Sequence, residues 1–192
     1  MPDQLSLSLW LRGFDSETML PGFGEALGAF PFSALRPGIS GLRIYAIEFT
    51  EPALFERAFA AGEAGLDAAI ELAEEFRAAD CAYLLEGFWD LWRLDPTGNW
   101  QLSPSPVVLS CFGPEFESEI GDHLRLELGP EDRFLPPPGA PQGARKAHSN
   151  LQSIVRLARD IEARVPIERQ SLWSESGEDF AERLLELADE AD

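Results

Sequence analysis

The sequence predicts an α+β fold: a mostly antiparallel sheet of about five or six strands, with helices packed on one face and a pair of helices at the C-terminus. Three observations predict this class. Several segments alternate between apolar and polar residues, a tryptophan-rich stretch turns back on itself at a Pro- and Gly-containing turn, and the last part of the chain has helical periodicity. Strand and helix patterns do not alternate regularly, which argues against a doubly wound parallel sheet.

The first two predicted strands rest on different patterns. In residues 5–12, "LSLSLWLR", a leucine occupies every second position, which is typical of a strand with one buried face. A Gly- and Pro-rich stretch follows, with one short helix expected around residues 23–30. Residues 41–49, "GLRIYAIEF", are apolar on both sides, which indicates a central strand.

A long helix is predicted next, over residues 50–76. Thr50, Glu51 and Pro52 form a typical helix start, with a capping hydroxyl, an early acid and an early proline. Apolar residues then recur at helical spacing. Gly62 and Gly65 interrupt this pattern at about 1 kcal/mol each relative to alanine, so a kink or close helix packing is expected there.

Residues 84–100, "LLEGFWDLWRLDPTGNW", hold three of the five tryptophans of the chain. The segment "DPTGN" is strong turn chemistry, because proline fixes φ at one position and glycine accepts a positive φ at another. A second β-rich segment, "WQLSPSPVVLSCF", follows, so a hairpin is predicted over residues 83–112. Pro104 and Pro106 cannot donate to a strand ladder, which places that part at an edge or a bulge.

The remaining predicted elements are one strand and two helices. Residues 122–129 alternate, with Leu124, Leu126 and Leu128 directed inward. Helical periodicity begins at a capping pattern at Ser149 and ends at Pro166. A second helix is predicted from residue 176 onward.

The chain length of 192 residues fits one domain, predicted over residues 1–192. A shared strand–strand–helix order leaves open a weak internal duplication, with halves near 1–80 and 105–192.

The formal net charge is −19, from 34 acidic and 15 basic residues. Such a charge repels nucleic acid and anionic lipid, so neither is expected as a partner, whereas a basic protein would be attracted. The N-terminus lacks the pattern of a signal peptide, and no apolar run is long enough to span a membrane. Both cysteines lie among apolar residues, and a reducing, cytoplasmic location is expected.

Six residues are the candidate binding residues, on the hairpin or on the strand that follows it: Glu86, Phe88, Asp90, Trp92, Trp100 and His123. On an extended strand Glu86 and Asp90 lie about 13 Å apart, too far for the acid/base pair of a glycoside hydrolase, which needs roughly 5 to 9.5 Å. Trp89 is expected in the core. For Phe88, Trp92 and Trp100, internal packing, a protein interface and a small ligand all stay open.

No metal site, cofactor or catalytic residue is predicted. The acidic run at residues 114–123 is expected to be a solvated loop, with a divalent cation site as the alternative, but its spacing matches no metal motif. With only His123 and His148, a three-histidine zinc site is excluded, and no G-x-S-x-G elbow is present.

The sequence therefore favours a small acidic protein that acts by binding a protein partner or by self-association, and it leans away from an enzyme. The alternative is a small-molecule binding protein or an enzyme with a pocket beside the 83–112 hairpin.

Overall fold

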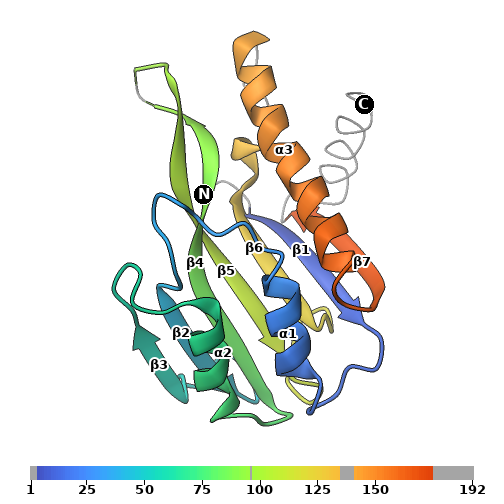
Figure 1. The fold of residues 1–192 in the computed structure, drawn as a ribbon. Coiled ribbons are helices and arrows are strands. Elements are labelled where there is room, and N and C mark those ends of the chain that lie inside the picture. The colour runs from blue at the N-terminus through green and yellow to red at the C-terminus, as the bar shows by residue number, and fades with distance from the viewer. Residues whose placement is uncertain (1–3, 96, 135–140, 175–192) are drawn as a thin grey trace.

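The computed structural model describes residues 4–95, 97–134 and 141–174 (Figure 1). In these ranges, seven strands form one antiparallel sheet in the order β3-β2-β4-β5-β6-β1-β7. The elements in chain order are β1 (Gln4–Leu11), α1 (Met19–Leu27), β2 (Gly41–Ala46), β3 (Phe55–Ala58), α2 (Leu66–Glu74), β4 (Cys81–Leu94), β5 (Trp100–Phe112), β6 (Leu124–Pro130), the 3-10 helix η1 (Glu131–Arg133), α3 (Pro141–Glu162) and β7 (Ile167–Ser174).

The predicted hairpin is confirmed. β4 and β5 pair in register from Ala82 opposite Phe112 to Leu94 opposite Trp100, and this long ribbon extends to the top of Figure 1. Trp89 is buried as expected and packs edge-on against Phe30. The alternation of β4 therefore separates a buried side, which carries Trp89, from the side that carries the candidate residues.

The three α-helices lie on the same side of the sheet (Figure 1). The core between sheet and helices contains the predicted inward leucines of β1 and β6, namely Leu5, Leu7, Leu9, Leu11, Leu124, Leu126 and Leu128. α3 contributes the predicted stripe that includes Leu151, Ile154 and Ile161. Each of these strands and helices has apolar residues on one face, and packing the helices on the sheet buries all of these faces in one core.

Two features of the predicted fold class are wrong, although the α+β class fits in broad terms. The sheet has seven strands, not five or six, and within the described part of the C-terminal region one helix, α3, is followed by a strand, not by a second helix. β7 forms because it pairs with the edge of β1, where Ser8 lies opposite Ser171 and Ser6 opposite Trp173. Its sequence, "IERQSLWS", has too few apolar residues to signal a strand by pattern alone. The second helix of the predicted pair, from residue 176 onward, lies outside the described residues.

The predicted long helix over residues 50–76 is also wrong. Residues 55–58 form β3, which pairs with β2 so that Phe55 lies opposite Ile44. Gly62 adopts a φ of 74°, which an α-helix excludes, and α2 begins only at Leu66. The strand partner overrides the helical spacing of the apolar residues, because β structure depends on tertiary context.

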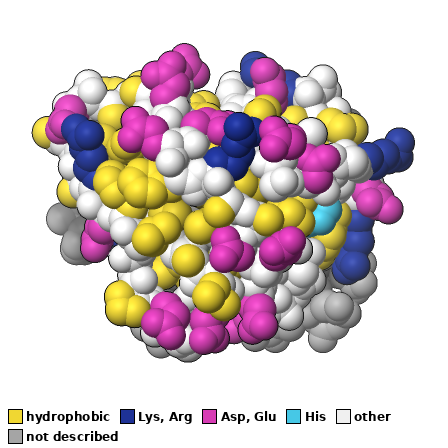
Figure 2. All heavy atoms as spheres, turned by 90° about the horizontal axis from the view of Figure 1, so that it is seen from below, with side chains coloured by type: hydrophobic (Ala, Val, Ile, Leu, Met, Phe, Trp, Pro, Cys, Tyr) yellow, Lys and Arg dark blue, Asp and Glu magenta, His cyan; other side chains and the backbone are white. Residues whose placement is uncertain are grey.

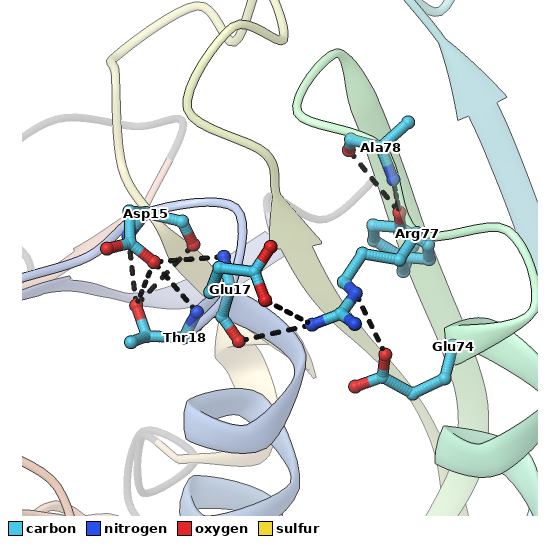
Figure 3. Close-up of polar contacts among 7 residues, drawn as sticks. Asp15, Glu17, Thr18, Glu74, Arg77 and Ala78 are labelled. Carbon is cyan, nitrogen blue, oxygen red and sulfur yellow. Dashed lines mark hydrogen bonds and ion pairs between the residues drawn. The ribbon is translucent and has the colours of Figure 1, made fainter.

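Polar contacts join α1 to α2 near the lower end of the sheet (Figure 3). Arg77, just after α2, contacts the carboxylates of Glu17 at 3.3 Å and Glu74 at 3.2 Å. Asp15 accepts hydrogen bonds from Thr18 and Glu17 at the start of α1, and these bonds lower the pKa of Asp15. The positive charge of Arg77 is thus already matched by two carboxylates.

Candidate functional site

The carboxylates of Glu86 and Asp90 both have partners within the fold. Glu86 forms an ion pair with Arg43 on the neighbouring strand β2. Asp90 accepts hydrogen bonds from the hydroxyl of Ser33 and from the backbone amides of Ala34 and Leu35, the latter two at 2.8 and 3.3 Å. These contacts attach the segment after α1 to the side of β4, and they give both acids a structural role.

Phe88 lies on the same side of β4, between these two carboxylates in sequence. The guanidinium of Arg36 stands 3.8 Å from the centre of its ring, which is a cation–π contact. The same segment that Asp90 holds therefore covers Phe88.

His123 is also engaged within the fold. Its Nδ1 accepts a hydrogen bond of 2.9 Å from the backbone amide of Leu11, and its ring stacks on Phe14 with the ring centres 4.0 Å apart. Burial lowers the pKa of His123, although the charges of Asp122 and Glu168 act in the opposite direction. The accepting Nδ1 implies a neutral ring with its proton on Nε2.

Trp92 and Trp100 lie close to each other at the upper end of the hairpin. Trp100 is opposite Leu94, two residues from Trp92, so the two indoles lie on the same side of the ribbon. Together with Arg93, Asp132 and Arg133 they line a hollow of about 390 Å³, which we call the hairpin hollow. A pocket of this volume is large enough for a small ligand.

α3 closes over this end of β4. The ammonium of Lys146 lies 3.2 Å from the centre of the Trp92 ring. The buried amide of Asn150 donates to the carbonyls of Trp92 and Arg133, at 2.9 and 2.8 Å, and accepts a bond of 2.9 Å from the amide of Trp92. Asn150 therefore fixes the helix, the end of β4 and η1 relative to each other.

The structure reveals a buried ion pair that the sequence did not predict. Asp122, whose side chain is fully buried, accepts two hydrogen bonds from Arg125, at 2.8 and 2.9 Å, and one of 2.7 Å from the hydroxyl of Ser8. Burial alone would lower the pKa of Arg125, but the hydrogen bond and charge of Asp122 raise it. Trp173 completes the network by donating to Ser8 at 3.0 Å. No pattern in one sequence signals this network, because Ser8 and Asp122 are 114 residues apart.

The second feature that the sequence missed is the surface formed by two adjacent loops, residues 47–54 between β2 and β3 and residues 113–123 between β5 and β6. We call it the loop-end surface. The amide of Glu117 donates to the carbonyl of Ile47 at 3.1 Å, which brings the two loops together. Figure 2 shows this end of the molecule, with apolar side chains across its middle and mostly acidic side chains around them, among which a few basic side chains also lie.

The apolar part of the loop-end surface has an aromatic base. Phe49 contacts the rings of Tyr45, Phe112 and Phe116, at centre distances of 5.2, 6.1 and 5.0 Å. Four exposed side chains lie on the two loops: Ile47 at 55%, Phe49 at 45%, Leu54 at 56% and Ile120 at 44% exposed. Several large exposed apolar groups at one end of a molecule mark interaction sites more often than single ones do.

The backbone at Ile47 is strained. Its φ is 68°, and among the described residues it is the only one other than glycine with a positive φ. The amide of Glu48 donates to the carbonyl of Ala46 at 2.8 Å, so Ile47 is the centre of a γ-turn in its rare, strained form. For a β-branched residue this conformation is an outlier that costs about 1–2 kcal/mol.

The two thiols do not form a candidate site. Both cysteines are buried as expected, and burial raises the pKa of each thiol, which makes them inert. Within the ranges that the structure covers, no group of three His, Cys, Asp or Glu side chains is placed to hold a metal ion. No helix there has the length and apolar character needed to cross a membrane.

Comparison of the chain with protein-family models, with curated proteins and with solved structures found no match.

Proposed function

We propose that this protein binds a basic protein partner through the loop-end surface. The observation that carries the proposal is the exposed side chain of Ile47 on a strained backbone.

The strain at Ile47 has no internal compensation from its side chain. Burial of an apolar side chain could offset the free-energy cost of the strained backbone, yet the side chain of Ile47 is 55% exposed. Glycine would adopt the same φ without a steric penalty. The local strain therefore serves to present an apolar group outward, and strained, exposed positions of this kind cluster at binding sites.

The charges around the apolar side chains favour a basic partner. The two loops carry five acids at the surface, Glu48, Glu51, Glu115, Glu117 and Glu119, and neither loop contains a lysine or an arginine. The sixth acid, Asp122, is neutralised by Arg125. An apolar centre flanked by the acids of both loops complements a partner with apolar anchors and basic flanks.

The same rim argues against self-association through this surface. In a two-fold dimer each patch meets its own copy, so the acids of one subunit would approach the acids of the other. Like charges in an interface are unfavourable by several kcal/mol.

The test is a selection of peptides from a random library displayed on phage, panned on the wild-type protein and counter-selected on Phe49→Ser. We expect enriched peptides that combine Lys or Arg with apolar residues. A synthetic peptide from the selection should bind wild type about ten-fold more tightly than Phe49→Ser, the equivalent of about 1.4 kcal/mol. Its affinity should fall steeply with added salt.

The matched control is Leu35→Ser, because Leu35 is 59% exposed but lies outside the two loops. This variant should bind the peptide like wild type. Peptides without basic residues, or equal losses in the two serine variants, would contradict the proposal. A dimer in sedimentation that Phe49→Ser dissociates would replace it with self-association.

A further inference from the structure

The opposite end of the sheet carries a second, independent candidate, the hairpin hollow. We infer that the hairpin hollow binds a small organic anion, with a carboxylate or phosphate group attached to a flat apolar body.

The charge of the hairpin hollow is opposite to that of the chain as a whole. Arg93 and Arg133 line it, and Lys146 lies against the ring of Trp92, which is one of its walls, whereas Asp132 is the acid among the lining residues. The nearby Glu131 accepts a hydrogen bond from Ser174. Two arginines thus line one cavity, and a lysine contacts one of its tryptophan walls, in a protein whose net charge is −19.

These three cations have no ion-pair partner within the described residues. The Nη1 atom of Arg133 is buried and lacks a hydrogen-bond partner in the same set. Burial, and then the positive charge of Arg93, lower the pKa of Arg133, and the charge of Asp132 offsets this lowering only in part. A partly buried guanidinium whose Nη1 lacks a partner is costly, and Asp132 forms no ion pair with it, so a bound anion would stabilise it.

The two tryptophans define the rest of the ligand. Trp92 and Trp100 supply broad, flat apolar surfaces on one side of the ribbon, and such surfaces favour a planar apolar group. The arginines supply paired N–H donors that match the geometry of carboxylate and phosphate oxygens. Asn150, which bonds both Trp92 and Arg133, holds the aromatic wall and the cationic wall in a fixed relation.

The experiment uses three probes of similar shape: 1-naphthoic acid, 1-naphthyl phosphate and the uncharged 1-naphthamide. Each is titrated into the full-length protein and followed by calorimetry and by tryptophan fluorescence. We expect both anions to bind about ten-fold or more tightly than the amide, which corresponds to one charge-assisted hydrogen bond. The ratio between carboxylate and phosphate then shows which head group the hollow prefers.

Arg133→Met and Arg93→Met test the site, with Arg12→Met as the control. Arg12 is exposed and follows the C-terminal end of β1, whereas Pro130 of the hollow pairs with Gln4 at the N-terminal end. Its replacement therefore makes the same change in net charge far from the hollow. Either hollow variant should lower the affinity for the anions about ten-fold while leaving that for the amide unchanged. Arg93 is exposed, so its variant should fold even if Arg133→Met does not. No saturable binding of either anion at millimolar concentration, or equal binding of anions and amide, would overturn the inference. Neither result would bear on the loop-end surface.

Discussion

The two ends of the sheet combine apolar surface with opposite charge. At the loop end, exposed aliphatic and aromatic groups stand among acids, and the nearby Arg77 is already paired with two carboxylates. At the hairpin end, two tryptophans stand among cations that have no ion-pair partner within the described residues. The net charge of −19 is thus the sum of regions that differ in charge, and a basic partner is expected at the loop end only.

The two ends of the sheet also differ in the charge of the buried polar groups that stabilise them. A charged pair, Asp122 with Arg125, anchors the loop end, whereas a neutral amide, Asn150, anchors the hairpin end. Substitutions at these anchors should produce the largest effects and should separate the two regions.

The largest effect is expected from Asp122→Ala. This change leaves Arg125 partly buried without its partner and should lower the free energy of unfolding by about 3–5 kcal/mol. Urea denaturation measures the loss. Glu119→Ala, in the same loop but exposed, should change stability by less than about 0.5 kcal/mol. Replacing the pair together, Asp122→Leu with Arg125→Met, should restore most of the loss, and a double variant as unstable as the single one would contradict the assignment of the cost to an unpaired charge.

The next effect is expected from Asn150→Leu. The substitution leaves the amide and carbonyl of Trp92 without their partner and should cost roughly 2–3 kcal/mol. It should also weaken naphthoate binding, because Trp92 and Arg133 lose their common anchor. Gln101→Leu, on an exposed position of the same hairpin, serves as the control and should stay within about 0.5 kcal/mol of wild type. Loss of peptide binding at the loop end in Asn150→Leu would show that the two ends are not independent.

Ile47→Gly should change stability and binding in opposite directions: the free energy of unfolding should stay the same or rise, and the affinity for the peptide should fall. Relief of the left-handed strain gains about 1–2 kcal/mol, and the added freedom of the unfolded chain removes about 0.4–1 kcal/mol of that. The variant should therefore be as stable as wild type or slightly more stable, while its affinity for the selected peptide falls. Leu54→Gly is the matched control, with the same exposure but no positive φ, and should be destabilised. Destabilisation of Ile47→Gly beyond about 1 kcal/mol would show that the side chain contributes to internal packing.

The smallest effect concerns pH. Because the pKa of His123 in the folded state lies below its ordinary value of 6.5, the unfolded chain binds more protons between these two values. The free energy of unfolding should therefore fall as pH drops below about 6.5 and should level off below the folded pKa. His123→Asn keeps an acceptor for the amide of Leu11 and removes the titration, so its stability should depend less on pH over this interval. Identical slopes in the two proteins would show that His123 is not the titrating group.

The sequence predicted those elements whose apolar residues have one clear period. β1, β6 and the β4–β5 hairpin were predicted because their leucines or their turn residues carry the pattern locally. β3 and β7 were not, because each is an edge strand that depends on its neighbour: β3 on Ile44 and Leu42 of β2, β7 on the serines of β1. Edge strands have weak patterns of their own, so pairing in space decides them.

For the candidate residues the sequence identified aromatic positions better than the roles of charged ones. Trp92 and Trp100 were candidate binding residues on the predicted hairpin, and both line the hollow. The roles of the carboxylates depend on partners from distant segments of the chain: Glu86 pairs with Arg43, and Asp90 accepts a hydrogen bond from Ser33. The strain at Ile47 is a backbone property that residue type does not signal, since isoleucine is the residue least expected there.

The most direct test of the contrast between the two ends is nuclear magnetic resonance with two soluble nitroxide probes, one cationic and one anionic, and a neutral nitroxide as reference. Relative to the mean over the chain, the cationic probe should broaden the amides of residues 47–54 and 113–123, and the anionic probe those of residues 92–94 and 132–133. The same broadening pattern from both charged probes would contradict the account, because it would mean that the two ends do not differ in electrostatic potential.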